Sequence, residues 1–335
     1  MTALPVIAAL GAGRMGRGIA HVFAYAGHRV ALIDVKARSP EATRRLEQEA
    51  RGEIEASLAA LAEIGVFAAA EIPAILGRIA FAGREAAPAA LAAAAYIFEG
   101  VPEVLDWKRE ALAFAAPHLS ADAVLASTTS SFLVDTLAAF APAPERFLNA
   151  HWLNPAYIVP LVELSPGQRT DAAVLAAVKA LLEAIGKVPV ICAAAPGFIV
   201  PRIQALAMNE AARIVEEGLA TPEDVDKATR YGIGFRYAAM GLLEFIDYGG
   251  GDILYYASRY LAEAMGAPRF AAPEIVDRNM RDGRIGLRSG RGFYDFVGVD
   301  VAAYRKDVLS RLVGQLRHVD LLLPPGAAAR RRDAS

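Results

Sequence analysis

A histidine and a glutamate twelve positions apart are the two residues of this sequence best suited to acid–base chemistry. His151 and Glu163 lie in the stretch HWLNPAYIVPLVE, which is typical of a strand, an Asn-Pro turn and a second strand. Such a reversal returns Glu163 to His151, where the carboxylate accepts a hydrogen bond from one imidazole nitrogen and raises the basicity of the other. This arrangement suits a general base that acts on an alcohol.

The other histidines have no carboxylate at a comparable spacing, and a single histidine is more often structural than chemical. On spacing alone, a structural role therefore stays open for His151 as well. The histidines for which a structural role is favoured are His21, His28, His118 and His318.

A glycine-rich turn near the N-terminus predicts a site for a dinucleotide. Gly11, Gly13 and Gly16, with Arg14 and Met15 before the last of them, form a G-x-G-x-x-G motif directly after an apolar run. The first glycine permits a tight turn, the second admits a pyrophosphate to the helix N-terminus, and the third lets helix and strand pack closely. By itself the motif is also compatible with an ordinary strand-to-helix turn.

An acidic residue at the end of the next apolar run supports the dinucleotide interpretation. Asp34 follows Gly16 by 18 residues, where a carboxylate accepts hydrogen bonds from the adenosine ribose hydroxyls. Its charge repels a 2′-phosphate, so the sequence predicts NAD rather than NADP. Lys36 and Arg38 lie close by and weaken this preference without reversing it.

Short apolar runs alternate with longer alanine-rich stretches up to about residue 190. This alternation predicts an α/β fold, in which an N-terminal Rossmann-type, doubly wound parallel sheet is covered by helices on both faces. A helical stretch at 38–64 is too long for a simple crossover and could project as an arm. The predicted strands are 5–10, 29–35, 94–101, 123–128 and 188–193, and the predicted helices are 14–26, 103–116, 131–139 and 171–185.

The pattern changes after Ala195-Pro196-Gly197, beyond which helices are predicted and strands are not. Thr221 followed by Pro222 is a strong helix start, because the hydroxyl caps the first turn and proline suits its first position. The sequence therefore predicts an NAD-binding domain at 1–193, an all-α substrate and dimerisation domain at 194–320, and a flexible tail at 321–335.

Composition excludes several classes of protein. The chain has 335 residues, with 35 basic and 37 acidic side chains, which argues against a nucleic-acid binder. Its apolar runs are shorter than the roughly 18 residues of a membrane span. The single Cys192 excludes an intrachain disulfide and a multi-cysteine metal site, so no metal is expected. One cysteine and no recognisable signal peptide favour a cytoplasmic location.

Several motifs in a fixed order resemble the L-3-hydroxyacyl-CoA dehydrogenase family, including its relatives L-gulonate 3-dehydrogenase (lambda-crystallin) and L-carnitine dehydrogenase. The resemblance runs from the glycine motif to about residue 296. It implies a 3-hydroxybutyryl-CoA dehydrogenase-like enzyme of fatty acid metabolism. The matching stretches are GAGRMGRGIA, FEGVPEVLDWKRE, STTSS, HWLNP followed by PLVEL, PGFIVPR and SGRGFYDF.

The resemblance also implies roles for individual residues. His151 matches the catalytic base and Glu163 its partner, while Ser130 matches a serine that hydrogen-bonds the reacting oxygen. Asn154 matches an asparagine at the junction of cofactor and substrate. The residues that the resemblance places on the nicotinamide-ribose side are Glu99 and Lys108. Alternatively, Lys108 is a solvent-exposed charge on a helix.

Three positions depart from the family pattern. Thr128 and Pro201 each replace an asparagine, and Pro201 removes a side-chain amide from the substrate site. Asn209, on the same predicted helix, is a candidate to compensate. Arg236 lies in a segment that is more similar to the relatives acting on free acids. Its guanidinium suits a carboxylate of the substrate. The alternative is that Arg236 is a surface residue without a role in binding.

The sequence therefore predicts NAD-dependent oxidation of a short-chain L-3-hydroxyacyl-CoA, such as 3-hydroxybutyryl-CoA, in a cleft between the two domains. Two alternatives stay open: a dehydrogenase of a free 3-hydroxy acid, and an NAD-binding, crystallin-like protein without turnover. A homodimer is expected through helices 198–218 and 251–265, because they carry more apolar residues than a half-buried surface requires. Neither a nucleic acid nor a membrane is expected as a partner.

Overall fold

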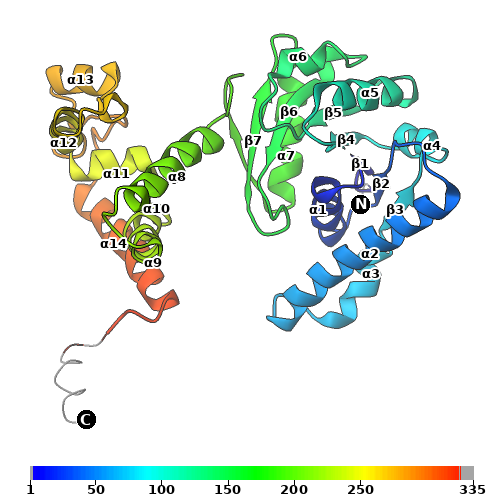
Figure 1. Cartoon of the computed structure of the whole chain (residues 1–335), viewed down its shortest axis with the longest axis horizontal. Coiled ribbons are helices and arrows are strands. Elements are labelled where there is room, and N and C mark those ends of the chain that lie inside the picture. Colours follow the sequence, from blue (N-terminus) through cyan, green and yellow to red (C-terminus); the bar gives the residue numbers. More distant parts are fainter. Residues whose placement is uncertain (1–2, 324, 326–335) are drawn as a thin grey trace. The chain divides into compact units, whose positions relative to one another are not determined.

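The computed structural model describes residues 3–323 and Pro325, and divides between Met208 and Asn209 into two compact units. The first unit holds a single sheet of eight strands (Figure 1). The domain boundary predicted after residue 193 stays a prediction. The flexible tail is predicted at 321–335. Except for 321–323 and Pro325, it lies outside the described residues.

The sheet is almost entirely parallel, in the order β3-β2-β1-β4-β5-β6-β7-β8. Only the β6–β7 pair is antiparallel. The first six strands have the order of a dinucleotide-binding fold, in which ligands bind where the connections diverge, here between β1 and β4. The strands are β1 (Ile7–Leu10), β2 (Val30–Ile33), β3 (Ile79–Ala82), β4 (Tyr96–Glu99), β5 (Val124–Ser127), β6 (Phe147–Trp152), β7 (Leu161–Pro166) and β8 (Val188–Ile191).

Helices cover both faces of this sheet, as the apolar strands require. Alternate residues of β1 point to opposite faces: Ile7 and Ala9 join one buried cluster, and Ala8 and Leu10 the other. On the first face pack α1 (Arg14–Tyr25), α2 (Pro40–Glu63), α3 (Ile72–Leu76) and α7 (Ala172–Ala184). On the second pack α4 (Ala87–Ala92), α5 (Leu105–Ala115) and α6 (Val134–Ala138). The predicted doubly wound α/β fold is confirmed.

The predicted long helix at 38–64 is present as α2. Ser39 caps it, since its hydroxyl accepts a hydrogen bond from the Ala42 amide at 3.2 Å. Its apolar stripe, which includes Ile54 and Leu58, is buried in the core shared with α1. Figure 1 shows α3 lying alongside α2. The segment after α2 contains α3, β3 and α4, none of which was predicted from the sequence.

All regular elements described between 209 and 323 are helices, as predicted, with isolated bridges near Arg291. The predicted start at Thr221 is present, and the Thr221 hydroxyl accepts a hydrogen bond from the Asp224 amide at 3.2 Å. The α-helices of this part are α8 (Val200–Glu216), which begins in the first unit, α9 (Pro222–Ala228), α10 (Phe235–Tyr237), α11 (Leu242–Gly249), α12 (Gly251–Ala264), α13 (Glu274–Arg281) and α14 (Val301–His318).

Two tyrosines on α12 are well exposed, Tyr256 at 61% and Tyr260 at 71%. They belong to the face on which the homodimer is predicted, and that dimer stays a prediction. Within residues 3–323, no helix combines the length and apolar character needed to cross a membrane.

Candidate active site

The glycine turn between β1 and α1 is shaped for a ligand that approaches the backbone closely. Gly11 has φ +115°, and a Cβ on Gly16 would lie 1.9 Å from the Gly11 carbonyl oxygen, so neither position accepts a side chain. Gly13 differs, because a Cβ there would meet no described atom within 4 Å. The space in front of Gly13 is open, and it faces the N-terminus of α1, where an anion is favoured.

A pocket of about 670 Å³ lies along this turn. We call it the dinucleotide pocket, because a glycine cradle, a helix N-terminus and a carboxylate at the end of β2 fit NAD. The lining residues are Gly11, Ala12, Gly13, Arg14, Met15, Arg17, Asp34, Val35, Lys36, Arg38, Leu46, Gly100, Val101, Pro102, Glu103, Thr128 and Asn154.

Asp34 lines this pocket, is buried, and is paired with a cation. Its Oδ2 accepts a hydrogen bond from Arg38 Nε at 2.6 Å, and its Oδ1 is 3.4 Å from the Lys36 amide. Arg38 therefore pairs with the carboxylate that the sequence predicts to bind the ribose. The weaker preference for NAD over NADP stays a prediction.

His151 and Glu163 lie directly opposite each other on the antiparallel strands β6 and β7. His151 Nδ1 is 2.7 Å from Glu163 Oε2. The other carboxylate oxygen, Oε1, accepts hydrogen bonds from the Ile199 amide at 2.9 Å and the Val200 amide at 2.8 Å. Glu163 is fully buried and His151 is 6% exposed. The reversal predicted from the sequence thus brings the two side chains together.

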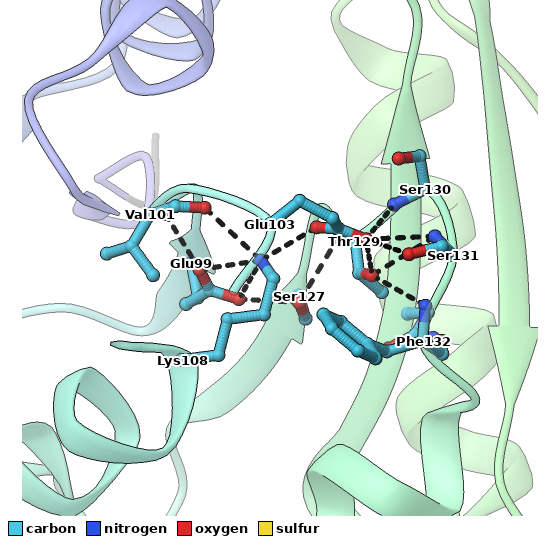
Figure 2. Close-up of polar contacts among 10 residues, drawn as sticks. Glu99, Val101, Glu103, Lys108, Ser127, Thr129, Ser130, Ser131 and Phe132 are labelled. Atoms are coloured by element: carbon cyan, nitrogen blue, oxygen red, sulfur yellow. Dashed lines mark hydrogen bonds and ion pairs between the residues drawn. The ribbon is translucent and has the colours of Figure 1, made fainter. Parts of the chain in front are cut away.

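Glu103 holds the loop that carries Ser130 (Figure 2). Its Oε1 accepts hydrogen bonds from the amides of Ser130 and Ser131, at 3.1 and 2.9 Å, and from the hydroxyls of Ser131 and Thr129. Its Oε2 lies 3.4 Å from Lys108 Nζ. One carboxylate thereby connects α5 to the exposed serine loop.

The ionised form of Glu103 is favoured by these contacts. Burial alone would raise the pKa of the Glu103 carboxyl, but hydrogen bonds from Thr129 and Ser131 and the charge of Lys108 outweigh it and hold the pKa below its ordinary value. Glu103 was not predicted from the sequence, although its place just beyond a strand end and five residues before Lys108 marked it as a candidate.

Glu99 and Lys108 form a buried ion pair next to this loop. Lys108 Nζ is 3.1 Å from both Glu99 oxygens, which also accept from the Val101 amide at 2.7 Å and the Ser127 hydroxyl at 2.5 Å. Glu99 is 0% and Lys108 is 1% exposed, so the alternative of a solvated Lys108 is wrong. The pair supports the pocket wall, and its contact with a cofactor stays a prediction.

A second pocket, of about 480 Å³, lies between α1, α2 and the loop after β6. We call it the side pocket. It shares Arg14, Arg17 and Asn154 with the dinucleotide pocket, so the two adjoin. The lining residues are Arg14, Arg17, Gly18, His21, Glu53, Ile54, Ala56, Ser57, Ala60, Asn154, Pro155, Ala156 and Tyr157.

His21 in the side pocket is held as a neutral ring. It stacks on Tyr157 with centroids 4.7 Å apart, and its Nδ1 is 2.8 Å from the Ser57 hydroxyl. Burial, with a smaller contribution from the charge of Lys187, lowers the pKa of His21 to about 4.

From this shift we expect the protein to lose stability in acid through His21. The unfolded chain binds a proton at a pKa near 6.5 and the folded chain only near 4, so stability is lost as pH falls between those values. The loss attributable to His21 is about 2 kcal/mol at pH 5. We expect the free energy of urea unfolding to fall less from pH 7 to pH 5 in His21→Gln than in the unsubstituted protein. An equal fall in both proteins would show that His21 does not carry this sensitivity.

The remaining predicted substrate residues lie in or near the helical unit. Asn209 is exposed on α8. Arg236 Nε donates to the Gly232 carbonyl at 2.9 Å, and its guanidinium lies 4.6 Å from the Phe245 ring centroid. Their part in substrate binding stays a prediction. Pro201 lies in the first turn of α8, and Thr128 lines the dinucleotide pocket.

Comparison with known proteins matches both halves of the chain to one family. The family model described as "3-hydroxyacyl-CoA dehydrogenase, NAD binding domain" matches residues 6–195. The one described as "3-hydroxyacyl-CoA dehydrogenase, C-terminal domain" matches residues 197–296.

Curated and solved relatives agree with this match. The 5-formyl-3-hydroxy-2-methylpyridine 4-carboxylate 5-dehydrogenase of Mesorhizobium japonicum is 28% identical over 93% of this chain and 97% of its own length. The 3-hydroxybutyryl-CoA dehydrogenase of Bradyrhizobium diazoefficiens is 32% identical over 87% and 95%. A crystal structure of a 3-hydroxyacyl-CoA dehydrogenase from Archaeoglobus fulgidus has 31% identity and a TM-score of 0.73, and the match covers 95% of this chain and 100% of that one. The chain therefore belongs to the 3-hydroxyacyl-CoA dehydrogenase family and is an NAD-dependent oxidoreductase acting on a CH–OH group.

Proposed function

We propose that the protein oxidises the 3-hydroxyl of a short-chain L-3-hydroxyacyl-CoA, such as 3-hydroxybutyryl-CoA, with His151 as the general base. The observation that carries this proposal is the buried His151–Glu163 pair. His151 stands three residues before Asn154, which lines both pockets. The closeness of His151 to Asn154 along the chain supports a site in which an acid–base group serves both the cofactor and the substrate.

Because Nδ1 of His151 is hydrogen-bonded to Glu163, Nε2 is the nitrogen that acts as the base. A neutral ring that donates from Nδ1 to Glu163 has an unprotonated Nε2, which takes the proton of the substrate hydroxyl. As the hydroxyl proton leaves, the hydrogen on C3 departs with the electron pair of the C3–H bond as hydride, and C3 becomes a carbonyl carbon. NAD, when bound, accepts that hydride. Glu163 stabilises the imidazolium that forms, and the Ser130 hydroxyl orients the reacting oxygen.

The side pocket favours a substrate that extends well beyond its reacting carbon. It continues from the dinucleotide pocket along α1 and α2, and Arg14 and Arg17 stand at the junction. Arg17 forms an ion pair with Glu53 across it. A thioester with a long polar tail uses such a space, whereas a small free acid does not need it.

A free acid is the second candidate. The relative from Mesorhizobium japonicum, a pyridine carboxylate dehydrogenase by name, matches nearly the whole chain. Pro201 also removes an amide that the family resemblance places in the substrate site. Both observations favour a carboxylate in place of the thioester.

A substrate panel separates these two candidates. NADH formation at 340 nm is measured with 3-hydroxybutyryl-CoA, longer 3-hydroxyacyl-CoAs, free 3-hydroxybutyrate, gulonate, carnitine and the pyridine substrate. We expect the highest kcat/KM with the short thioester. A kcat/KM at least tenfold higher with a free acid would reverse the assignment.

Replacing Asp34 tests the choice of cofactor. In Asp34→Ser the carboxylate that binds the ribose is lost and Arg38 is released from its 2.6 Å contact, so the site becomes more favourable for a 2′-phosphate. We expect the ratio of kcat/KM for NAD to that for NADP to fall by about tenfold or more, equivalent to about 1.4 kcal/mol. Asp122→Ser, at an exposed aspartate, serves as the control. An unchanged ratio would show that Asp34 does not bind the ribose hydroxyls.

A further inference from the structure

The turn that leads into α8 has an unusual backbone conformation. Gly197 has φ +76°, and the next residue, Phe198, has φ +43°. A left-handed conformation suits glycine but costs about 1 kcal/mol or more for a residue with a bulky side chain. Phe198 is nevertheless buried, with 7% of its surface exposed. A residue in such a conformation is kept in place by its surroundings.

The Phe198 ring lies against the imidazole of His151. Their centroids are 5.3 Å apart and the ring planes are within 17° of parallel. The amides of the next two residues, Ile199 and Val200, are the donors to Glu163 Oε1. One turn therefore contacts both members of the pair. The Phe198 ring packs on the face of His151, and the two amides bind Oε1 of Glu163.

Each of these contacts restricts a different motion. The hydrogen bond from His151 Nδ1 to Glu163 fixes the position of one ring atom but leaves the imidazole able to tilt about that atom. The Phe198 ring lies parallel to one face of the imidazole and opposes this tilt, because offset stacking is one of the preferred arrangements of aromatic pairs. The direction of Nε2, which the bond to Glu163 alone does not determine, is then set by Phe198.

We infer that Phe198 is a positioning residue for the acid–base pair, and that its left-handed backbone is retained because it places the ring on His151. This inference rests on the proposed role of His151 as the base. It predicts that losing the ring harms turnover more than it harms folding or cofactor binding.

Kinetics of two variants test the inference. Phe198→Leu keeps an apolar side chain but removes the stack, and Phe198→Tyr keeps the ring. We expect Phe198→Leu to lower kcat by about tenfold or more, because small errors in orientation are costly for proton transfer. The dissociation constant for NAD is expected to stay within about twofold, and Phe198→Tyr to recover most of the turnover.

A spectroscopic measurement separates the stack from the activity. The chain has five histidines, so a protein labelled with ¹³C at histidine Cε1 gives five ring signals, which variants lacking one histidine each assign. We expect Phe198→Leu to move the His151 signal, because the ring current of Phe198 is removed, and to leave the other four in place. Phe114→Leu is the matched control, since Phe114 lies edge-on to His118 at 5.7 Å. It is expected to move only the His118 signal and to leave turnover unchanged.

The outcomes are distinguishable. A moved His151 signal together with a lower kcat and an unchanged NAD affinity supports the inference. If Phe198→Leu turns over normally, or if Phe198→Tyr fails to recover turnover while remaining folded, Phe198 is only part of the core. If His151→Ala remains active, the proposed base is wrong, and the histidine spectra still show whether the stack exists in solution.

Discussion

His151→Ala is expected to lower kcat for oxidation by about 10²- to 10⁴-fold, the usual contribution of a general base. The affinity for NAD is expected to stay nearly unchanged, because His151 lies in β6 and is absent from the lining of the dinucleotide pocket as described. Steady-state kinetics and titration of NAD by fluorescence measure the two effects separately.

His318→Ala is the control, since His318 is exposed on α14 and far along the sequence from the pair. His318→Ala is expected to leave kcat and the affinity for NAD unchanged. Near-normal turnover of His151→Ala would place the base elsewhere. Equal losses of turnover and of NAD affinity would point to a general disruption of the site.

Gly13→Val is expected to weaken NAD binding strongly without harming the fold. A Cβ at Gly13 meets no described atom within 4 Å, and its φ of −85° is accessible to any residue. The added side chain therefore projects into the space predicted for the pyrophosphate. We expect the dissociation constant for NAD to rise by on the order of 10- to 100-fold, which corresponds to about 1.4–2.8 kcal/mol.

The third glycine of the same motif provides the contrast. A Cβ on Gly16 would lie 1.9 Å from the Gly11 carbonyl oxygen, so Gly16→Ala forces α1 away from β1 and is expected to lower the thermal midpoint as well. Thermal unfolding without cofactor separates the two variants. A Gly13→Val protein that binds NAD normally would mean that the pyrophosphate does not pass over this turn.

Features that depend on local pattern were predictable from the sequence. The glycine motif, the apolar runs of β1 and β2 and the carboxylate of Asp34 all lie within one strand–helix–strand unit. The opposition of His151 and Glu163 follows from a chain reversal at the intervening turn, since an antiparallel pair brings such residues face to face.

Features that depend on tertiary contacts were not predictable in the same way. Strand β3 reads IAFA, a four-residue run that is half alanine, and only its pairing with β2 makes it a strand. Lys108 reads as a surface charge on α5, and its burial follows from the two carboxylates of Glu99 and Glu103 that the fold brings to it. Phe198 reads as an ordinary apolar residue, because the sequence does not reveal a left-handed backbone.

Transfer of an isotope label tests most directly whether this site carries out the proposed reaction. 3-Hydroxybutyryl-CoA deuterated at C3 is incubated with NAD and the enzyme, and the reduced cofactor is analysed by mass spectrometry. We expect the reduced cofactor to carry one deuterium, with its formation slowed at least a hundredfold in His151→Ala. Reduced cofactor without deuterium, or none formed from the thioester, would contradict hydride transfer from C3 at this site.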